Sequence, residues 1–111
     1  MRPAPAVVDD PDLAVWHAGF PDATPIAELV ARQEQTIVGV VDRMRVTPGR
    51  ALTVRLVDGS GALEVVWTGR SSLPGLTLGT ALRVTALVVE ERPGRRTLRN
   101  PVWAPVAEPF A

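Results

Sequence analysis

The sequence of 111 residues contains no cysteine, no lysine and a single histidine, His17. Without cysteine the chain has no disulfide, no thiolate nucleophile and no zinc–thiolate site, which fits a reducing compartment. No apolar run approaches the roughly 18 residues of a membrane-spanning helix, and the first residues lack the apolar core of a signal peptide. We therefore expect a one-domain cytoplasmic protein without membrane contact.

Reactive side chains are equally scarce. His17 could join Asp58 and Ser71 or Ser72 in a triad only if the proline-rich start of the chain placed it beside them. One histidine and scattered carboxylates give no metal-ligand spacing, and no Lys-Ser/Thr follows Gly59-Ser60-Gly61 as it would in a phosphate-binding loop. We expect no catalytic residue, metal or cofactor, and hence a binding module in place of an enzyme.

The formal net charge is zero, but the two signs are unevenly distributed along the chain. Residues 1–34 hold two arginines against six acidic residues, a net charge of −4. Residues 35–103 hold ten arginines against five acidic residues, a net charge of +5. Arginine stacks on bases and binds phosphates in pairs, although a GC-rich coding bias explains the missing lysines equally well. The region from residue 35 onward is therefore the candidate for binding a polyanion.

Proline divides the chain into a leader, a folded domain and a tail. The first 23 residues carry four prolines among alanines and aspartates, with too little regular apolar spacing for a packed element. Thr24 and Pro25 are typical of a helix start and predict a short helix over residues 24–32. We expect a flexible acidic leader over 1–23, a folded domain over 24–106 and a tail over 107–111.

Five β-rich segments follow the predicted helix. They cover residues 35–47, 51–58, 62–68, 80–92 and 95–103. Apolar and polar residues alternate in several of them, which predicts half-buried strands. Gly39 interrupts the first segment, where we expect a bulge or sharp coil that lets one long strand join two sheets. The connection between Gly69 and Gly79 is too short and broken for a full helix.

A three-stranded meander, a connector and a final hairpin predict an all-β fold, the five-stranded Greek-key barrel called the OB-fold, with a short N-terminal helix and flexible tails. A small SH3-like barrel is the nearest competing fold. The helix that many OB-folds carry between strands three and four is missing, and the helix over 24–32 is expected to cap the barrel instead. The expected core consists of Leu52, Val54, Leu56, Leu63, Val65, Trp67, Leu82, Val84, Ala86 and Val88.

Four short motifs lie in order along the strand region. They are Asp58-Gly59-Ser60-Gly61, Val66-Trp67-Thr68-Gly69-Arg70, Leu73-Pro74-Gly75 and Asn100-Pro101. With them, residues 25–106 resemble the small stand-alone OB-fold nucleic-acid-binding proteins of high-GC bacteria, and more loosely the wedge domain of branched-DNA helicases. The chain departs from the pattern at residues 102–104, Val-Trp-Ala, where a Tyr-Glu-Leu type ending is expected. The resemblance implies a bacterial OB-fold module that binds nucleic acid.

Arginines gather where OB-folds bind oligonucleotides, across strands two and three and between the loops that join strands one to two and four to five. These loops are residues 47–50 and 91–96, and each contains Pro-Gly-Arg. The alternative explanation is that arginines occupy loops because loops are solvated. The predicted phosphate contacts are Arg43, Arg45, Arg50, Arg55, Arg92, Arg95, Arg96 and Arg99.

Aromatic residues are few, whereas proteins that bind single strands usually stack bases on several of them. Trp67 shares the parity of Leu63 and Val65, so core packing is favoured over stacking. Trp103 shares the parity of Thr97 and Arg99 and is the stacking candidate. We predict weak, salt-sensitive binding of single-stranded DNA or RNA without strong sequence preference.

The competing hypothesis is a protein-interaction module or a self-associating homodimer without a nucleic-acid role. Its basis is a set of apolar residues at outward positions, Val57, Val66, Leu87 and Val89. A further hypothesis places the acidic leader over the basic groove, as an intramolecular mimic of nucleic acid.

Overall fold

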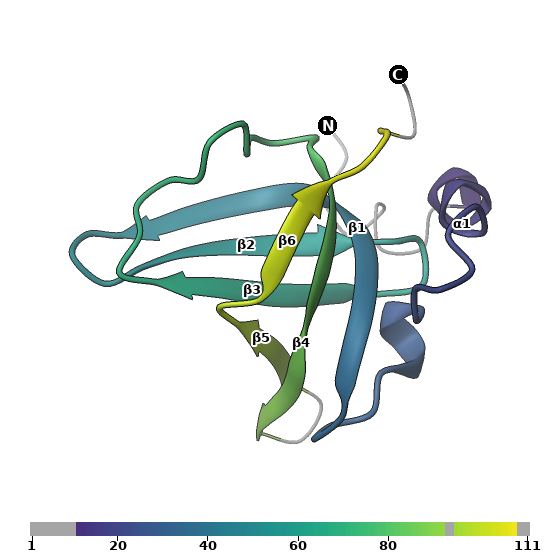
Figure 1. Cartoon of the computed structure of the whole chain (residues 1–111), viewed down its shortest axis with the longest axis horizontal. Coiled ribbons are helices and arrows are strands. Elements are labelled where there is room, and N and C mark those ends of the chain that lie inside the picture. The colour runs from purple at the N-terminus through teal and green to yellow at the C-terminus, as the bar shows by residue number, and fades with distance from the viewer. Residues whose placement is uncertain (1–10, 93–94, 109–111) are drawn as a thin grey trace, which may run out of the picture.

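Six strands and two short helical segments make up the described part of the chain, residues 11–92 and 95–108 of a computed structural model (Figure 1). For residues 91, 92 and 95 only the backbone is described. The elements are α1 (Pro11–His17), the 3-10 helix η2 (Ile26–Glu28), β1 (Glu34–Thr47), β2 (Ala51–Val57), β3 (Ala62–Thr68), β4 (Ala81–Arg92), β5 (Arg95–Arg99) and β6 (Val102–Pro105). No helix among them is long and apolar enough to cross a membrane.

The strands close into a barrel in the order β1-β2-β3-β5-β4, and β4 pairs back to β1. The β3–β5 pair is parallel and the other pairs are antiparallel. This topology is the five-stranded OB-fold, which confirms the predicted fold class. The last predicted strand is divided at Asn100-Pro101, and β6 continues along β4 where β5 ends. The connection from residue 69 to residue 80 contains no helix, as predicted.

One long strand, β1, belongs to both halves of the barrel. Residues 34–40 pair with β4 and residues 40–47 pair with β2, so Val40 has a partner on each side. The predicted sharing of this strand is confirmed, but the bulge lies at Asp42 and not at Gly39. Gly39 stays in register with Leu82, so the strand coils there without an extra residue. It can do so because glycine has no side chain to collide with β2.

A side chain at Gly39 would collide with β2. A Cβ there would lie 3.0 Å from the carbonyl oxygen of Val57 and 3.2 Å from Leu56 Cβ. Gly39→Val should therefore lower the free energy of unfolding by about 1–3 kcal/mol, as overpacking of a core does. Chemical denaturation measures this loss. Ala62→Val, at an exposed position of β3, is the control and should stay within about 0.5 kcal/mol of the native protein.

The barrel interior is a single apolar cluster built from inward positions of β1 to β5. Nine of the ten residues of the predicted core are buried in it, and Ala86 packs against it half-buried. Trp67 is 5% exposed, and its indole N–H donates to the Pro101 carbonyl at 3.3 Å, so its predicted place in the core is confirmed. Val57, predicted to face outward, is fully buried.

The predicted leader contains a packed element. Residues 11–17 form α1, whose Leu13 and His17 are buried, so the expectation of an unpacked segment is wrong for these residues. The apolar pattern of this segment is too short to predict a packed helix. Its buried side chains are held by contacts with residues far away in the sequence. The helix predicted over 24–32 is only the 3-10 turn of η2, because Leu29 is already extended. Residues 1–10 lie outside the described part of the chain.

Candidate functional site

The register of the sheet gathers four arginines on one outer face. Residues directly opposite each other in neighbouring strands point to the same side of a sheet. One row across β1, β2, β3 and β5 is Arg45, Thr53, Val66 and Arg99. The adjacent row is Arg43, Arg55, Glu64 and Thr97. We call these two rows the arginine face.

The bulge at Asp42 decides that β1 contributes to this face. In the sequence, Arg43 and Arg45 share the parity of Val41, which is buried in the core. The register shifts by one residue between Val41 and Arg43, and a one-residue shift exchanges the two sides of a strand. Met44 therefore packs against the core, while Arg43 and Arg45 are exposed.

Asp42 also binds an arginine of the neighbouring strand. Its carboxylate accepts two hydrogen bonds from Arg55, from Nε at 2.8 Å and from Nη2 at 2.6 Å. These hydrogen bonds raise the pKa of Arg55 above its ordinary value, against the lowering effect of burial. Arg55 is half-buried and lines a shallow hollow together with Arg43, Arg45, Thr53 and Glu64. Arg55 is therefore a fixed part of the face, with its charge compensated by Asp42.

Two arginines lie together at one end of the arginine face. Arg50 ends the turn between β1 and β2, and Arg70 follows β3. Their strands meet because the Gly69 N–H donates to the Arg50 carbonyl at 2.6 Å, and a second hollow is lined by both arginines. Arg70 was absent from the predicted contacts. Pairing Ala51 with Thr68 across the predicted hairpin would have placed it beside Arg50.

At the other end, Arg96 does not join the face. Arg96 precedes Thr97 in β5 and so points to the side of the strand opposite to Thr97 and Arg99. Its guanidinium donates to the Leu29 carbonyl at 2.6 Å. Arg96 thus holds the segment after η2 against β5, and its predicted role as a phosphate contact stays a prediction. Arg92 and Arg95 are partners in the backbone register, but their side chains and the Pro93-Gly94 turn lie outside the described part of the structure.

Trp103 is also not on the arginine face. Between β5 and β6 the pairing with β4 slips by one residue, at Asn100, whose φ is +50°. The slip turns Trp103 to the side of its partner Val84, a core residue. Its ring meets that of Trp67 edge-on, with centroids 6.4 Å apart. The predicted stacking position is thus corrected, because strand parity was counted through an irregular residue.

The acidic residues of the described leader lie elsewhere. Asp22 forms an ion pair with Arg83 of β4, and the Arg83 guanidinium lies over the Phe20 ring, 5.7 Å from its centroid. The Trp16 indole N–H donates to the Ala107 carbonyl at 3.0 Å. In Figure 1 α1 is at the opposite end of the molecule from the turn between β1 and β2. The helix α1 therefore lies away from that turn, and residues 1–10, the rest of the leader in the mimic hypothesis, lie outside the described part of the chain, so the hypothesis stays a prediction.

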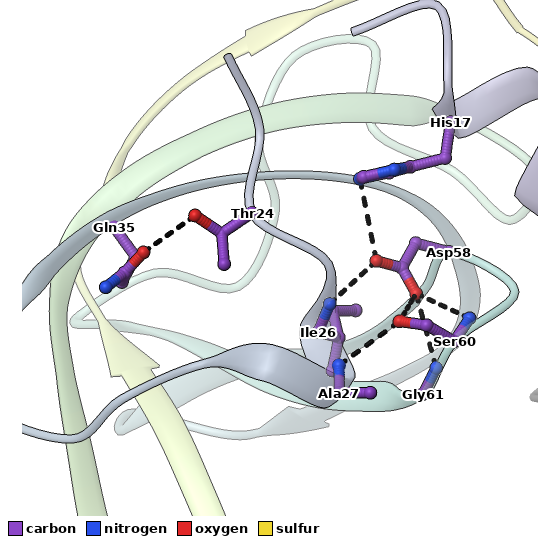
Figure 2. A network of polar contacts seen from close by, with 8 residues as sticks. All are labelled: His17, Thr24, Ile26, Ala27, Gln35, Asp58, Ser60 and Gly61. Atoms are coloured by element: carbon purple, nitrogen blue, oxygen red, sulfur yellow. Dashed lines mark hydrogen bonds and ion pairs between the residues drawn. The ribbon is translucent and has the colours of Figure 1, made fainter. Parts of the chain in front are cut away.

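Figure 2 shows two of the three residue positions considered for a triad, His17 and Asp58, together with Ser60, the serine beside them. Asp58 is 2% exposed and sits between His17, whose Nε2 is 3.6 Å away, and Ser60, whose hydroxyl donates to Oδ1 at 2.7 Å. In a hydrolytic triad the histidine must contact the hydroxyl, whereas here the carboxylate separates the two. Asp58 instead accepts from the backbone N–H groups of Ile26, Ser60 and Gly61, and two of these lie in its own turn, as is typical of an aspartate at a turn.

Metal ligands do not gather either: the described residues contain no group of three His, Asp or Glu side chains placed to hold an ion.

Solved structures share the fold at low sequence identity, whereas no protein-family model and no curated protein matches the chain. One is a chain of a replication protein A heterotrimer bound to ssDNA, with 20% sequence identity and a TM-score of 0.56. The match covers 68% of this chain and 58% of that chain. Another is a replication factor A related protein from Methanobacterium thermoautotrophicum, with 17% sequence identity and a TM-score of 0.61. The match covers 76% of this chain and 90% of that chain. A third is an OB domain from Methanosarcina mazei, with 17% sequence identity and a TM-score of 0.60. The match covers 78% of this chain and 84% of that chain. These likenesses establish the OB-fold.

Proposed function

We propose that this chain is a non-enzymatic OB-fold module that binds single-stranded nucleic acid on the arginine face. The observation that carries the proposal is the alignment of Arg43, Arg45, Arg55 and Arg99, from β1, β2 and β5, on one outer face of the sheet. OB-folds bind oligonucleotides on the face of strands two and three, which lies within this surface. A replication protein A chain of similar fold belongs to a complex with ssDNA, which adds support.

Contacts with the phosphate backbone of the nucleic acid dominate the proposed binding. Guanidinium groups bind phosphates whatever the base, so affinity falls steeply with salt and sequence preference is weak. None of the four aromatic side chains that the structure describes lies on the arginine face, so aromatic stacking contributes little there. Arg50 and Arg70 extend the charged path at the end of β3.

The competing role as a protein-interaction module has a weaker basis than the sequence indicated. Of its four apolar positions, Val57 is buried, Val66 and Val89 are half-buried, and only Leu87 is widely exposed, at 54%. Leu87 lies on β4, and Val66 lies within the arginine face. Of the four positions on which this hypothesis was based, only Leu87 is therefore both widely exposed and outside the arginine face.

Titration with labelled oligonucleotides at two salt concentrations tests the proposal. Single-stranded DNA and RNA should bind more tightly than duplexes of the same length at about 50 mM salt. Raising the salt to about 200 mM should weaken binding at least tenfold, because several phosphate contacts release counterions. Absence of binding at low salt, or salt-independent binding, would count against the proposal and favour the protein-interaction role.

A further inference from the structure

The arginine face lacks aromatic platforms among the described residues, yet it holds one flat group in a fixed orientation. Arg55 lies at its centre, between Arg43 of β1 and Glu64 of β3 in the same row. Its side chain is 20% exposed, and Asp42 binds it in a bidentate pair. Most exposed arginines sample many rotamers, so ordering them on binding costs side-chain entropy. Asp42 already restricts the rotamers of Arg55 in the unbound protein.

The contact between Asp42 and Arg55 uses one edge of the guanidinium. Asp42 accepts hydrogen bonds from Nε and Nη2, which lie on one edge of the group. Such an in-plane contact does not use either flat face. A guanidinium plane stacks on nucleobases, and it is more weakly hydrated than an ammonium group, so little hydration is lost on stacking.

The same pair makes Arg55 a poor phosphate contact. A phosphate would have to compete with a carboxylate that already occupies the two donors of one edge at 2.6–2.8 Å. The exposed arginines beside it are better placed for that role: Arg43 is in the same row, and Arg45 and Arg99 are in the adjacent one. The proposed phosphate contacts thus surround a central guanidinium whose donors on one edge are already used by Asp42.

We propose that Arg55 is the base-stacking platform of the arginine face and that Asp42, the bulge residue of β1, is the positioning residue that holds its plane. This inference rests on the proposed nucleic-acid function and assigns one nucleotide base to Arg55. The bulge then serves the site twice, since it turns Arg43 and Arg45 outward and supplies the carboxylate for Arg55.

Two oligonucleotides of about 10 units, one complete and one abasic with the same phosphates, separate stacking from phosphate binding. The measured quantity is the ratio of the affinities for the two at about 50 mM salt. Arg55→Lys keeps the charge and loses the plane, so it should lower this ratio about fivefold while affinity for the abasic strand stays unchanged. Arg45→Lys, the matched control, should leave the ratio unchanged.

Asp42→Asn gives an independent test with the guanidinium intact. If Arg55 stacks, loss of its anchor lowers the ratio of affinities about two- to threefold. If Arg55 is instead a phosphate contact restrained by Asp42, the same variant tightens binding to both strands and leaves the ratio unchanged, which would overturn the inference. Melting temperatures identify any variant that is not folded. Failure of the native protein to bind either strand would reject the proposed function itself, whereas binding with an unchanged ratio in Arg55→Lys rejects only the stacking role.

Discussion

Replacing Arg43, Arg45 and Arg99 together by alanine is expected to weaken binding of a single-stranded oligonucleotide about 100-fold at about 50 mM salt. Each of these side chains is exposed, and the register places them on the arginine face from two strands, β1 and β5. Each lost phosphate contact reduces the slope of log affinity against log salt by about 0.7 for a single strand. The slope of the triple variant should therefore be shallower by about 2.

Arg83→Gln is the matched control for this charge removal. Arg83 is on β4, where it pairs with Asp22, so its loss should change affinity less than about twofold. A triple variant that keeps the affinity and the salt slope of the native protein would show that the arginine face is not the binding surface. A loss of about fivefold in Arg83→Gln, one third of the expected loss of about 100-fold on a logarithmic scale, would indicate binding by net charge alone.

Asp58→Ala is expected to have the largest effect on stability. The buried carboxylate accepts hydrogen bonds from three backbone N–H groups and from the Ser60 hydroxyl, and it joins the turn after β2 to η2 (Figure 2). Removing it leaves buried donors without an acceptor, at about 1–3 kcal/mol for each group that water does not reach. We expect the free energy of unfolding to fall by about 3 kcal/mol and the melting temperature by about 10 °C or more.

Asp58→Asn keeps one acceptor oxygen at the same place and should lose about half as much stability. Ser60→Ala, which removes only one hydroxyl, should lose about 1 kcal/mol. The folded fraction of each variant should bind oligonucleotide as the native protein does, since Asp58 is not in either row of the arginine face. A melting temperature of Asp58→Ala within about 2 °C of the native value would contradict the assigned role.

Alternation of apolar residues was sufficient to predict the barrel. The inward positions of β2, β3 and β4 repeat every second residue, and the turns between β1, β2 and β3 carry glycine, so these strands and their order follow from local pattern. Gly39 also marked β1 as the strand shared by two parts of the barrel. These features depend on residues near each other in sequence, and the structure confirms them.

Irregular residues were the limit of that reasoning. Strand parity predicts which face a side chain occupies only while the register is unbroken, and Asp42 and Asn100 each shift it by one residue. The first shift places Arg43 and Arg45 on the outer face, and the second removes Trp103 from it. Asp42 carries no local signal of a bulge, whereas Asn100-Pro101 indicates the end of a strand but not the one-residue shift that follows it.

Long-range contacts set the remaining differences. Arg55 is paired by Asp42, 13 residues away, and Arg96 is held by Leu29, 67 residues away. Such partners cannot be found before the register is known, so the sequence could not show that Arg55 and Arg96 each hold a partner within the chain. The helix α1 is a similar case, because its burial depends on contacts with distant residues and not on its own short pattern.

Mapping the backbone amide signals of the labelled protein by NMR during titration with a single-stranded oligonucleotide tests most directly whether the arginine face is the binding site. The account predicts that the signals which shift most belong to residues 43–45, 53–55, 64–66 and 97–99, with smaller shifts near Arg50 and Arg70. The signals of α1 and β6 should stay in place. Shifts concentrated on β4, β6 and α1, with the arginine face unchanged, would contradict it.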